Sequence, residues 1–327
     1  MKSSTHSITR RQMLALGVAG AIGAPWVRAE STYPSHTVRV VLPYFSGGPN
    51  DIATRILTEE LSHAWNVPVI VLNKPGGNGT LGTLEVKSAA ADGYTVLSGA
   101  TFVVLNPLIY PDCGYTAQDF VPIAEFGSPP NVIVVREDAR WKTLDDLIKD
   151  ARARPRALKS PHAGVGSSIQ LGLSLFLKEA GVQVVVVPYK GSIAYVPDLL
   201  GGRLDFAFLA TQLALPQVQA GKLRVLATVS QQRLPQLPQV RTLSEAGFPG
   251  SVVLPWSGLF VRAGTPRPVV DRLREGVATA LRVPEVRERY ARMYAEVPQA
   301  PLAFAQLVDA ERTRWAHVVQ THAVEGL

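Results

Sequence analysis

The chain has 327 residues with 33 basic and 26 acidic side chains, a formal net charge of +7. Four basic residues and no acidic residue lie in the first 29 positions, so the remaining 298 residues carry only about +3. That mild charge, without a run of basic residues, gives no reason to expect a nucleic-acid partner, and the length is sufficient for two domains.

Residues 1–29 have the features of an export signal. A basic start that includes Arg10 and Arg11 is followed by twelve apolar residues, 13–24, and by a small-residue cleavage site that ends at Ala29. The arginine pair resembles the twin-arginine export signal, and the alternative is an ordinary secretory signal that happens to contain two arginines. No lipobox cysteine lies near the cleavage site, and no later apolar run is long enough to span a membrane. A cleaved, soluble, periplasmic protein is therefore expected.

From residue 38 onward, strand and helix signals alternate, which is typical of α/β architecture with mainly parallel sheets. Strands are predicted at 38–42, 69–72, 95–98, 132–135, 184–187, 205–209, 224–229 and 258–261. Helices are predicted at 50–64, 80–90, 143–153, 168–180, 192–201, 212–220, 266–281, 284–294 and 301–322. The run Val184–Val187 is apolar on both faces, which indicates a central strand of a sheet covered by helices.

The order of these elements favours two lobes, each a sheet flanked by helices. Residues 30–130 form the first lobe together with the largely helical tail 256–327, and residues 131–255 form the second. Because the tail is expected to return to the first lobe, the chain crosses twice and leaves a cleft between the lobes. Such clefts commonly bind small ligands, and hinge closure around the ligand is the expected motion.

A turn containing two glycines joins the strand 38–42 to the helix 50–64. Glycines let the backbone approach a ligand closely, and the free N–H groups and dipole of a first helical turn suit a carboxylate or phosphate. The alternative is a routine β–α turn with an Asn or Asp cap. Two aromatic residues before two glycines exceed what a cap requires, so this loop is predicted to bind an anion. Its candidate site residues are Tyr44, Phe45, Ser46, Gly48, Asn50 and Asp51.

A second glycine loop, residues 73–82, contains the pattern G-x-G-x-x-G from Gly77 to Gly82, between a predicted strand and a predicted helix. A dinucleotide site also requires an acidic residue about 20 positions later. Residues 98–103 contain none, and the loop follows the second strand rather than the first. A backbone wall of the cleft is therefore favoured over nucleotide binding. The candidate site residues in this region are Asn78 and Thr101.

The single cysteine, Cys113, follows Pro111 and Asp112 in a predicted turn. One cysteine leaves no internal disulfide, so packing must stabilise the exported protein. Cys113 is expected to be a bystander rather than a reactive thiol.

The third loop, residues 163–170, leads into the helix predicted at 168–180. Its two serines can cap that helix and donate hydrogen bonds to an anion. A nucleophilic serine is the alternative, but G-x-S-x-G is absent and the sequence places none of the six histidines beside these serines. The histidines show no metal-ligand spacing, so neither catalysis nor a metal is expected. The candidate site residues are Gly164, Val165, Gly166, Ser167, Ser168 and Gln170.

Two further residues each keep two interpretations. Lys190, after a strand end, either supplies charge at the mouth of the cleft or is a solvated turn lysine. Trp256, where the chain crosses back between lobes, either packs at the hinge or forms a wall of the cleft.

The ordered set of motifs resembles the Bug/TctC family, the extracytoplasmic solute receptors of tripartite tricarboxylate transporters. The matching segments, which span essentially all of the mature chain, are 33–34, 41–44, Gly47-Gly48 with Asp51, 73–76, 92–95, 106–110, 187–191, 199–202, 220–224 and 258–266. The resemblance implies a two-lobed periplasmic binding-protein fold, type II-like, that closes over a small carboxylate. It also implies that backbone amides and hydroxyls of residues 164–168 hold the carboxylate. The loop 44–51 then contacts the other end of the ligand, often through waters.

The chain departs from the family pattern in three places. Gln170 stands where the family often has histidine, and residues 209–211 lack the aspartate that it often has there. Without that acid a ligand ammonium group has no partner, so the expected ligand is a carboxylate without an ammonium group, and a partly apolar or aromatic one fits this expectation. Ser46 and Pro49 alter the proline-rich first loop of the family, so the water-mediated contact is expected to be rearranged.

These observations predict a monomeric receptor that binds a small organic carboxylate and presents it to the membrane components of a tripartite tricarboxylate-type transporter, without catalysis or a cofactor. Two alternatives stay open. One is an exported nucleotide-dependent enzyme that uses the Gly77–Gly82 loop, and the other is a ligand sensor that feeds a membrane signalling partner. The remaining candidate site residues are Tyr189, Leu209 and Ala210.

Overall fold

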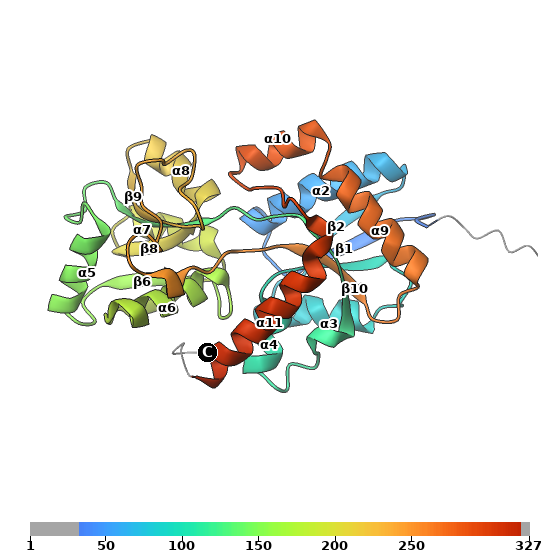
Figure 1. Cartoon of the computed structure of the whole chain (residues 1–327), viewed down its shortest axis with the longest axis horizontal. Helices are drawn as coiled ribbons and strands as arrows, with labels where there is room; N and C mark the ends of the chain where they lie inside the picture. The colour runs from blue at the N-terminus through green and yellow to red at the C-terminus, as the bar shows by residue number, and fades with distance from the viewer. Residues whose placement is uncertain (1–32, 322–327) are drawn as a thin grey trace, which may run out of the picture. The chain divides into compact units, whose positions relative to one another are not determined.

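The computed structural model describes residues 33–321 (Figure 1). The predicted export signal and His322 lie outside the described residues, so the cleavage site and the twin-arginine motif stay predictions. Within the described range, no helix combines the length and the apolar character that crossing a membrane requires. Residues 36–321 belong to one structural unit, which contains the sheets, helices and cavity described below.

A five-stranded sheet combines strands from the beginning and the end of this unit, in the order β2-β1-β3-β10-β4. β1 pairs in parallel with β2 and β3, whereas β10 pairs antiparallel with β3 and β4. The chain after residue 255 therefore returns to the sheet formed by its first part. The strands are β1 (Val38–Leu42), β2 (Val69–Asn73), β3 (Thr95–Gly99), β4 (Phe120–Glu125) and β10 (Gly258–Arg262).

Helices cover both faces of this sheet, because its central strands are apolar on both sides. Leu97 packs with α4 and α11 in one core cluster. The next residue, Ser98, points the other way, and its hydroxyl is 2.9 Å from that of Thr54 on α2. α9 and α10 pack against α2 on this second side (Figure 1). The helices are α2 (Pro49–Trp65), α3 (Thr80–Ser88), α4 (Phe102–Ile109), α9 (Arg267–Ala280), α10 (Pro284–Arg292) and α11 (Phe304–Gln320).

A three-stranded sheet has the order β8-β5-β9, and both of its pairs are antiparallel. Val134 and Leu209 pack with α7 and α8 on one face, while Ile133 and Phe208 pack with α5 and α6 on the other. A separate parallel pair, β6 and β7, lies beside β8. The elements are β5 (Asn131–Arg136), β6 (Lys159–His162), β7 (Val185–Pro188), β8 (Phe206–Ala210), β9 (Leu223–Val229), α5 (Leu144–Ala153), α6 (Ser168–Ala180), α7 (Val196–Leu200) and α8 (Thr211–Gln219).

Two crossover segments, 126–130 and 252–257, connect the elements of the five-stranded sheet with those of the three-stranded sheet. They run side by side: the Phe126 N–H donates to the Ser257 carbonyl at 3.0 Å, and the hydroxyls of Ser128 and Ser257 are 2.6 Å apart. β5 and β10 begin at these segments. Each of these two strands therefore runs antiparallel to its neighbouring strands, whose carboxyl ends point toward the crossover segments.

Several sequence predictions about the elements need correction. The expectation of mainly parallel pairing is wrong for the three-stranded sheet and holds for only half of the pairs in the five-stranded sheet, because β5 and β10 each enter their sheet from a crossover segment. The run Val184–Val187 is no buried central strand: β7 pairs with β6 alone in the described chain, and Val185 and Val186 are 40% and 41% exposed. The sequence analysis missed α4, which is too uniformly apolar to show a helical period, and β4, which Pro122 interrupts. It also missed β6, which lacks β-branched residues.

Candidate ligand-binding site

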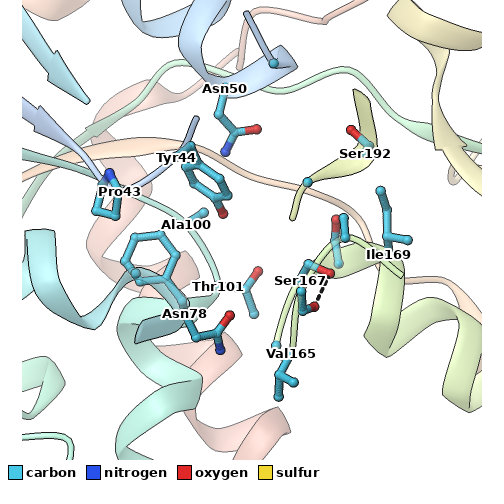
Figure 2. Close-up of a pocket in the computed structure, with 18 of the residues that line it drawn as sticks. Pro43, Tyr44, Asn50, Asn78, Ala100, Thr101, Val165, Ser167, Ile169 and Ser192 are labelled. Carbon is cyan, nitrogen blue, oxygen red and sulfur yellow. Dashed lines mark hydrogen bonds between the residues drawn. The ribbon is translucent and has the colours of Figure 1, made fainter. Parts of the chain in front are cut away.

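A cavity of about 1000 Å³ lies where the strand ends meet the crossover segments (Figure 2). Residues that follow β1, β3, β6 and β7 line it, together with the last residue of β8 and the first residue of β5. The carboxyl ends of strands are where α/β sheets commonly bind ligands. Among the lining residues that the structure describes, only Asp112 and Lys190 are charged, and both are exposed to solvent. The interior of the cavity is therefore uncharged.

Most of the predicted site residues come together at this cavity. Those that line it are Tyr44, Phe45, Gly48, Asn50, Asn78, Thr101, Gly164, Val165, Gly166, Ser167, Ser168, Tyr189 and Ala210. Those that do not are Ser46, Asp51, Gln170 and Leu209. The four exceptions shape the surrounding loops or belong to a core cluster.

Asp51 lies beneath the first loop and is 3% exposed. Its carboxylate accepts hydrogen bonds from the Gly47 N–H at 3.0 Å and the Ser46 hydroxyl at 3.3 Å. Arg55 Nε and Asn73 Nδ2 donate to it at 3.0 and 2.8 Å. Burial raises the pKa of this carboxyl, but the hydrogen bonds from Arg55, Gly47 and Asn73 outweigh burial and hold the pKa below its usual value. Contrary to the prediction, Asp51 and Ser46 fold the loop instead of lining the cavity.

Gln170 supports the third loop in the same way. Its Oε1 accepts a hydrogen bond from the Gly166 N–H at 2.6 Å, and the residue is 5% exposed. Ser167 caps α6, since its hydroxyl accepts from the Gln170 N–H at 3.2 Å and donates to the Gly164 carbonyl at 2.7 Å. Gln170 therefore fixes the shape of the loop and, contrary to the prediction for a site residue, does not line the cavity.

The prediction for Leu209 also fails, for a reason of strand geometry. Alternate residues of β8 point to opposite faces of the sheet, and Leu209 belongs to the core cluster under α7 and α8. Ala210, the last residue of β8, lines the cavity and brings only a methyl group to it.

The amino end of α6 leaves backbone donors at the cavity wall. Within residues 33–321 the N–H groups of Val165, Ser168 and Ile169 have no hydrogen-bond acceptor, and all three residues line the cavity. α6 has 13 residues, so its dipole adds positive potential at this end. The Ser168 hydroxyl accepts a long hydrogen bond of 3.4 Å from Asn131 and keeps its own proton for a ligand. This arrangement suits a carboxylate.

The wall across from α6 carries unpaired hydroxyls. Figure 2 shows Tyr44 and Thr101 facing Ser167 across the cavity. In the described chain neither the Tyr44 nor the Thr101 hydroxyl has a hydrogen-bond partner, although Thr101 is only 3% exposed. Burial raises the pKa of Tyr44, so the phenol stays protonated and can donate. Asn50, in the first turn of α2, adds an amide to this wall.

The glycines of the second loop serve packing. A Cβ atom at Gly79 would lie 2.9 Å from the Phe102 ring, and one at Gly82 would lie 2.9 Å from Pro43. Residues 77–82 therefore bring α3 close to β1 and α4. The match to G-x-G-x-x-G has this structural cause and requires no dinucleotide.

The third loop lies close to the second loop. A Cβ atom on Gly166 would lie 3.1 Å from Leu105 and 3.3 Å from the amide nitrogen of Asn78. That amide donates to Asn106 Oδ1 at 3.1 Å, which fixes its position. A side chain at 166 would press on these neighbours, and φ is +73° there, a conformation that favours glycine.

The structure places His162 beside the third loop, a position that the sequence alone could not assign to any histidine. It ends β6, is 7% exposed, and its Nδ1 accepts a hydrogen bond from the Gly164 N–H at 3.2 Å. Burial lowers the pKa of His162, which favours the neutral ring. The Ser167 hydroxyl donates to a backbone carbonyl and makes no bond to this histidine, so the pair does not form a nucleophile with its base. In residues 33–321 no group of three His, Cys, Asp or Glu side chains is arranged to hold a metal ion.

Several cavity residues were not predicted. Cys113 lines the cavity, and its thiol donates to the Tyr115 carbonyl at 3.3 Å. Asn131 and Ser192 line it as buried polar residues. Trp256 combines both interpretations, since it packs in a core cluster and also lines the cavity. No sequence motif marks Cys113 or Asn131, whereas Ser192 directly follows the family-like segment 187–191.

The architecture is that of the periplasmic binding proteins, and "periplasmic binding protein BugD" superposes on this chain with a TM-score of 0.82 at 31% identity, over 90% of this chain and 99% of that one. The family described as "Tripartite tricarboxylate transporter family receptor" matches residues 53–324, and this chain belongs to that family. The "UPF0065 protein in tcbD-tcbE intergenic region" of Pseudomonas sp. strain P51 is 36% identical over 318 residues, which are 96% of this chain and 94% of the relative.

Two solved structures of similar proteins contain ligands. MatC from Rhodopseudomonas palustris, with bound malate, has a TM-score of 0.80 at 32% identity over 88% of this chain and 100% of that one. A second R. palustris protein, with adipate, has a TM-score of 0.83 at 31% identity over 89% and 99%. The family and these neighbours are solute-binding proteins, so this chain is a binding protein and not an enzyme.

Proposed function

We propose that this protein captures a small organic carboxylate in the cavity and presents it to the membrane components of a tripartite tricarboxylate-type transporter. The observation that carries this proposal is the set of free N–H groups of Val165, Ser168 and Ile169 at the amino end of α6. The malate and adipate bound to two similar proteins support it, because both ligands are carboxylates.

The carboxylate binds with its oxygens against the amino end of α6. The three N–H groups and the Ser168 hydroxyl replace water as its donors, and the helix dipole stabilises its charge. Within residues 33–321 no arginine lines the cavity, and Lys190 is exposed. Because neutral groups do the binding, we expect the affinity to change little between low and physiological salt, unlike that of a surface ion pair.

The cavity favours a carboxylate without an ammonium group. Asp112, the only acidic residue that lines it in the described part of the chain, is exposed, and Leu209 and Ala210 leave no acid at the end of β8. An ammonium group in the interior would lose its hydration without gaining a charged partner, which costs several kcal/mol. The same reasoning disfavours amino acids such as glutamate.

Closure over the ligand is part of the proposal. Residues 30–130 with 256–327 act as one lobe and residues 131–255 as the other. The crossover segments 126–130 and 252–257 are the candidate hinge. The hydrogen bonds that tie these segments together support this assignment, since they keep the two connections moving as one.

The site of action follows from the export signal proposed for residues 1–29. We propose that the mature protein is a soluble monomer in the periplasm, exported by the twin-arginine route. The arginine pair at positions 10 and 11 supports the export route, and the family to which the chain belongs supports the periplasmic location.

A thermal-shift panel on the mature protein tests the function. The panel contains malate, adipate, a tricarboxylate, benzoate, glutamate and NAD. A ligand at about 100 times its dissociation constant stabilises a protein by about 2.7 kcal/mol, which raises the melting temperature by several degrees. A shift with carboxylates and none with glutamate or NAD is the expected result. A shift with NAD alone would contradict the proposal.

A further inference from the structure

Two tryptophans share one carboxylate beside the cavity. Trp256, in the crossover segment 252–257, lines the cavity, is 4% exposed and donates from Nε1 to Glu311 Oε2 at 3.2 Å. Trp315 on α11 donates from its own Nε1 to the same oxygen at 2.8 Å. Trp315 is fully buried and does not line the cavity. Glu311 therefore links a residue of the cavity wall to the C-terminal helix.

α11 holds the crossover segment at a second point as well. Arg314 donates to the Val252 carbonyl at 3.0 Å, and its guanidinium lies 3.6 Å from Glu311 Oε1. Glu311 is 9% exposed, and a carboxylate buried to that degree requires partners. Two indole N–H groups and one guanidinium supply them. One turn of α11 thus fixes both ends of the segment.

Packing restricts the Trp256 indole further. Its ring centroid lies 5.5 Å from that of Phe304 in a T-shaped contact and 6.3 Å from that of Phe260. With its N–H bonded to Glu311, the indole has no donor left for a ligand and can offer the cavity only carbon surface.

We propose that Glu311 is a positioning residue of the ligand site: by binding the Trp256 N–H, it holds the indole as a fixed apolar wall for the part of the ligand that carries no carboxylate. This inference rests on the proposed function. When a substitution removes the charge of Glu311, the hydrogen bond from Trp256 Nε1 weakens and the Trp256 indole rotates more freely. The ligand then loses a contact, although Glu311 itself never touches it.

The test compares four single variants and one double variant with the wild type. Glu311→Gln keeps the shape and removes the charge, and Asp309→Asn is the matched control on the same helix, at a side chain that is 74% exposed. Trp315→Phe removes the other indole donor and reports on stability alone. Trp256→Phe is used alone and combined with Glu311→Gln. Acrylamide quenching of the Trp256 emission, isolated by subtracting the Trp256→Phe spectrum, follows the indole without ligand, and calorimetry with adipate follows binding.

Glu311→Gln is expected to raise the quenching of Trp256 and to raise the dissociation constant for adipate about three- to tenfold. In the Trp256→Phe background it is expected to change the affinity no further. Unchanged quenching overturns the inference whatever adipate does. An equal loss of affinity in Trp315→Phe, or a full additional loss in the double variant, also overturns it, because the effect then does not pass through Trp256. A wild type that binds no carboxylate contradicts the proposed function instead.

Discussion

Replacing Asp51 with alanine is predicted to loosen the first loop of the site. The carboxylate accepts four hydrogen bonds, three of them at 3.0 Å or less. A hydrogen bond to a charged group contributes about 1.5–3 kcal/mol. Gly47 is exposed and the Arg55 side chain is 46% exposed, so water replaces part of what these two donors lose. The expected loss in the free energy of unfolding is about 2–4 kcal/mol, below the sum of the individual bonds.

Asp51→Asn separates charge from shape. The carboxamide keeps one acceptor oxygen but turns an NH₂ group toward a donor, so we expect about half the loss of the alanine variant. Because hydrogen bonds depress the pKa of Asp51, its contribution is present at neutral pH and is lost as the pH falls through the folded-state pKa. The difference between wild type and Asp51→Asn is therefore expected to shrink below about pH 4.

Urea unfolding at neutral and acidic pH measures both effects, with the m-value as a check on two-state behaviour. Adipate affinity is expected to fall in parallel, because Tyr44 and Asn50 lie on the loosened loop. A loss below about 1 kcal/mol in Asp51→Ala at neutral pH, with unchanged m, would refute the role of this residue in folding the loop.

Three further predictions concern single residues. Ser168→Ala is expected to weaken carboxylate binding by about 1–3 kcal/mol in calorimetry, and an unchanged affinity would remove this hydroxyl from the site. Gly166→Ala is expected to destabilise the protein in urea by more than Gly181→Ala, since both have positive φ but only the first would press a Cβ against a neighbour; equal losses would contradict this. Burial raises the pKa of Glu125 to about 7. The free energy of unfolding is therefore expected to fall by up to about 3 kcal/mol as the pH rises from about 4.5 to 7, because the unfolded chain releases this proton first. Glu125→Gln is expected to remove that slope, and a variant that keeps the wild-type slope would disprove the assignment.

The start of a helix is predicted most accurately from the sequence where a capping residue precedes an apolar stripe. α6 begins at Ser168 and ends at Ala180 as predicted, because Ser167 caps it and Gly181 ends it in a left-handed conformation. β6 escaped prediction because Lys-Ser-Pro-His has no strand preference and is held by pairing with β7. The conformation of such a segment depends on a strand that is distant in the sequence, and local sequence patterns carry no information about that partner.

The site shows a second limit of sequence reasoning. The glycine loops and serine caps located the cavity, since strand ends and helix starts meet there. The sequence did not predict which way each side chain points. Asp51 and Gln170 turn away from the cavity and accept hydrogen bonds from backbone N–H groups of their own loops. Trp256 reaches the cavity through a crossover segment that has no periodic pattern.

A crystal structure of the mature protein, with the carboxylate that gives the largest thermal shift, tests the central claim most directly. We predict that one carboxylate of the ligand lies within hydrogen-bond distance of the N–H groups of Ser168 and Ile169, at the amino end of α6. A ligand whose carboxylate pairs with Lys190 at the mouth, or lies outside the cavity, would contradict the account of how this protein binds an anion.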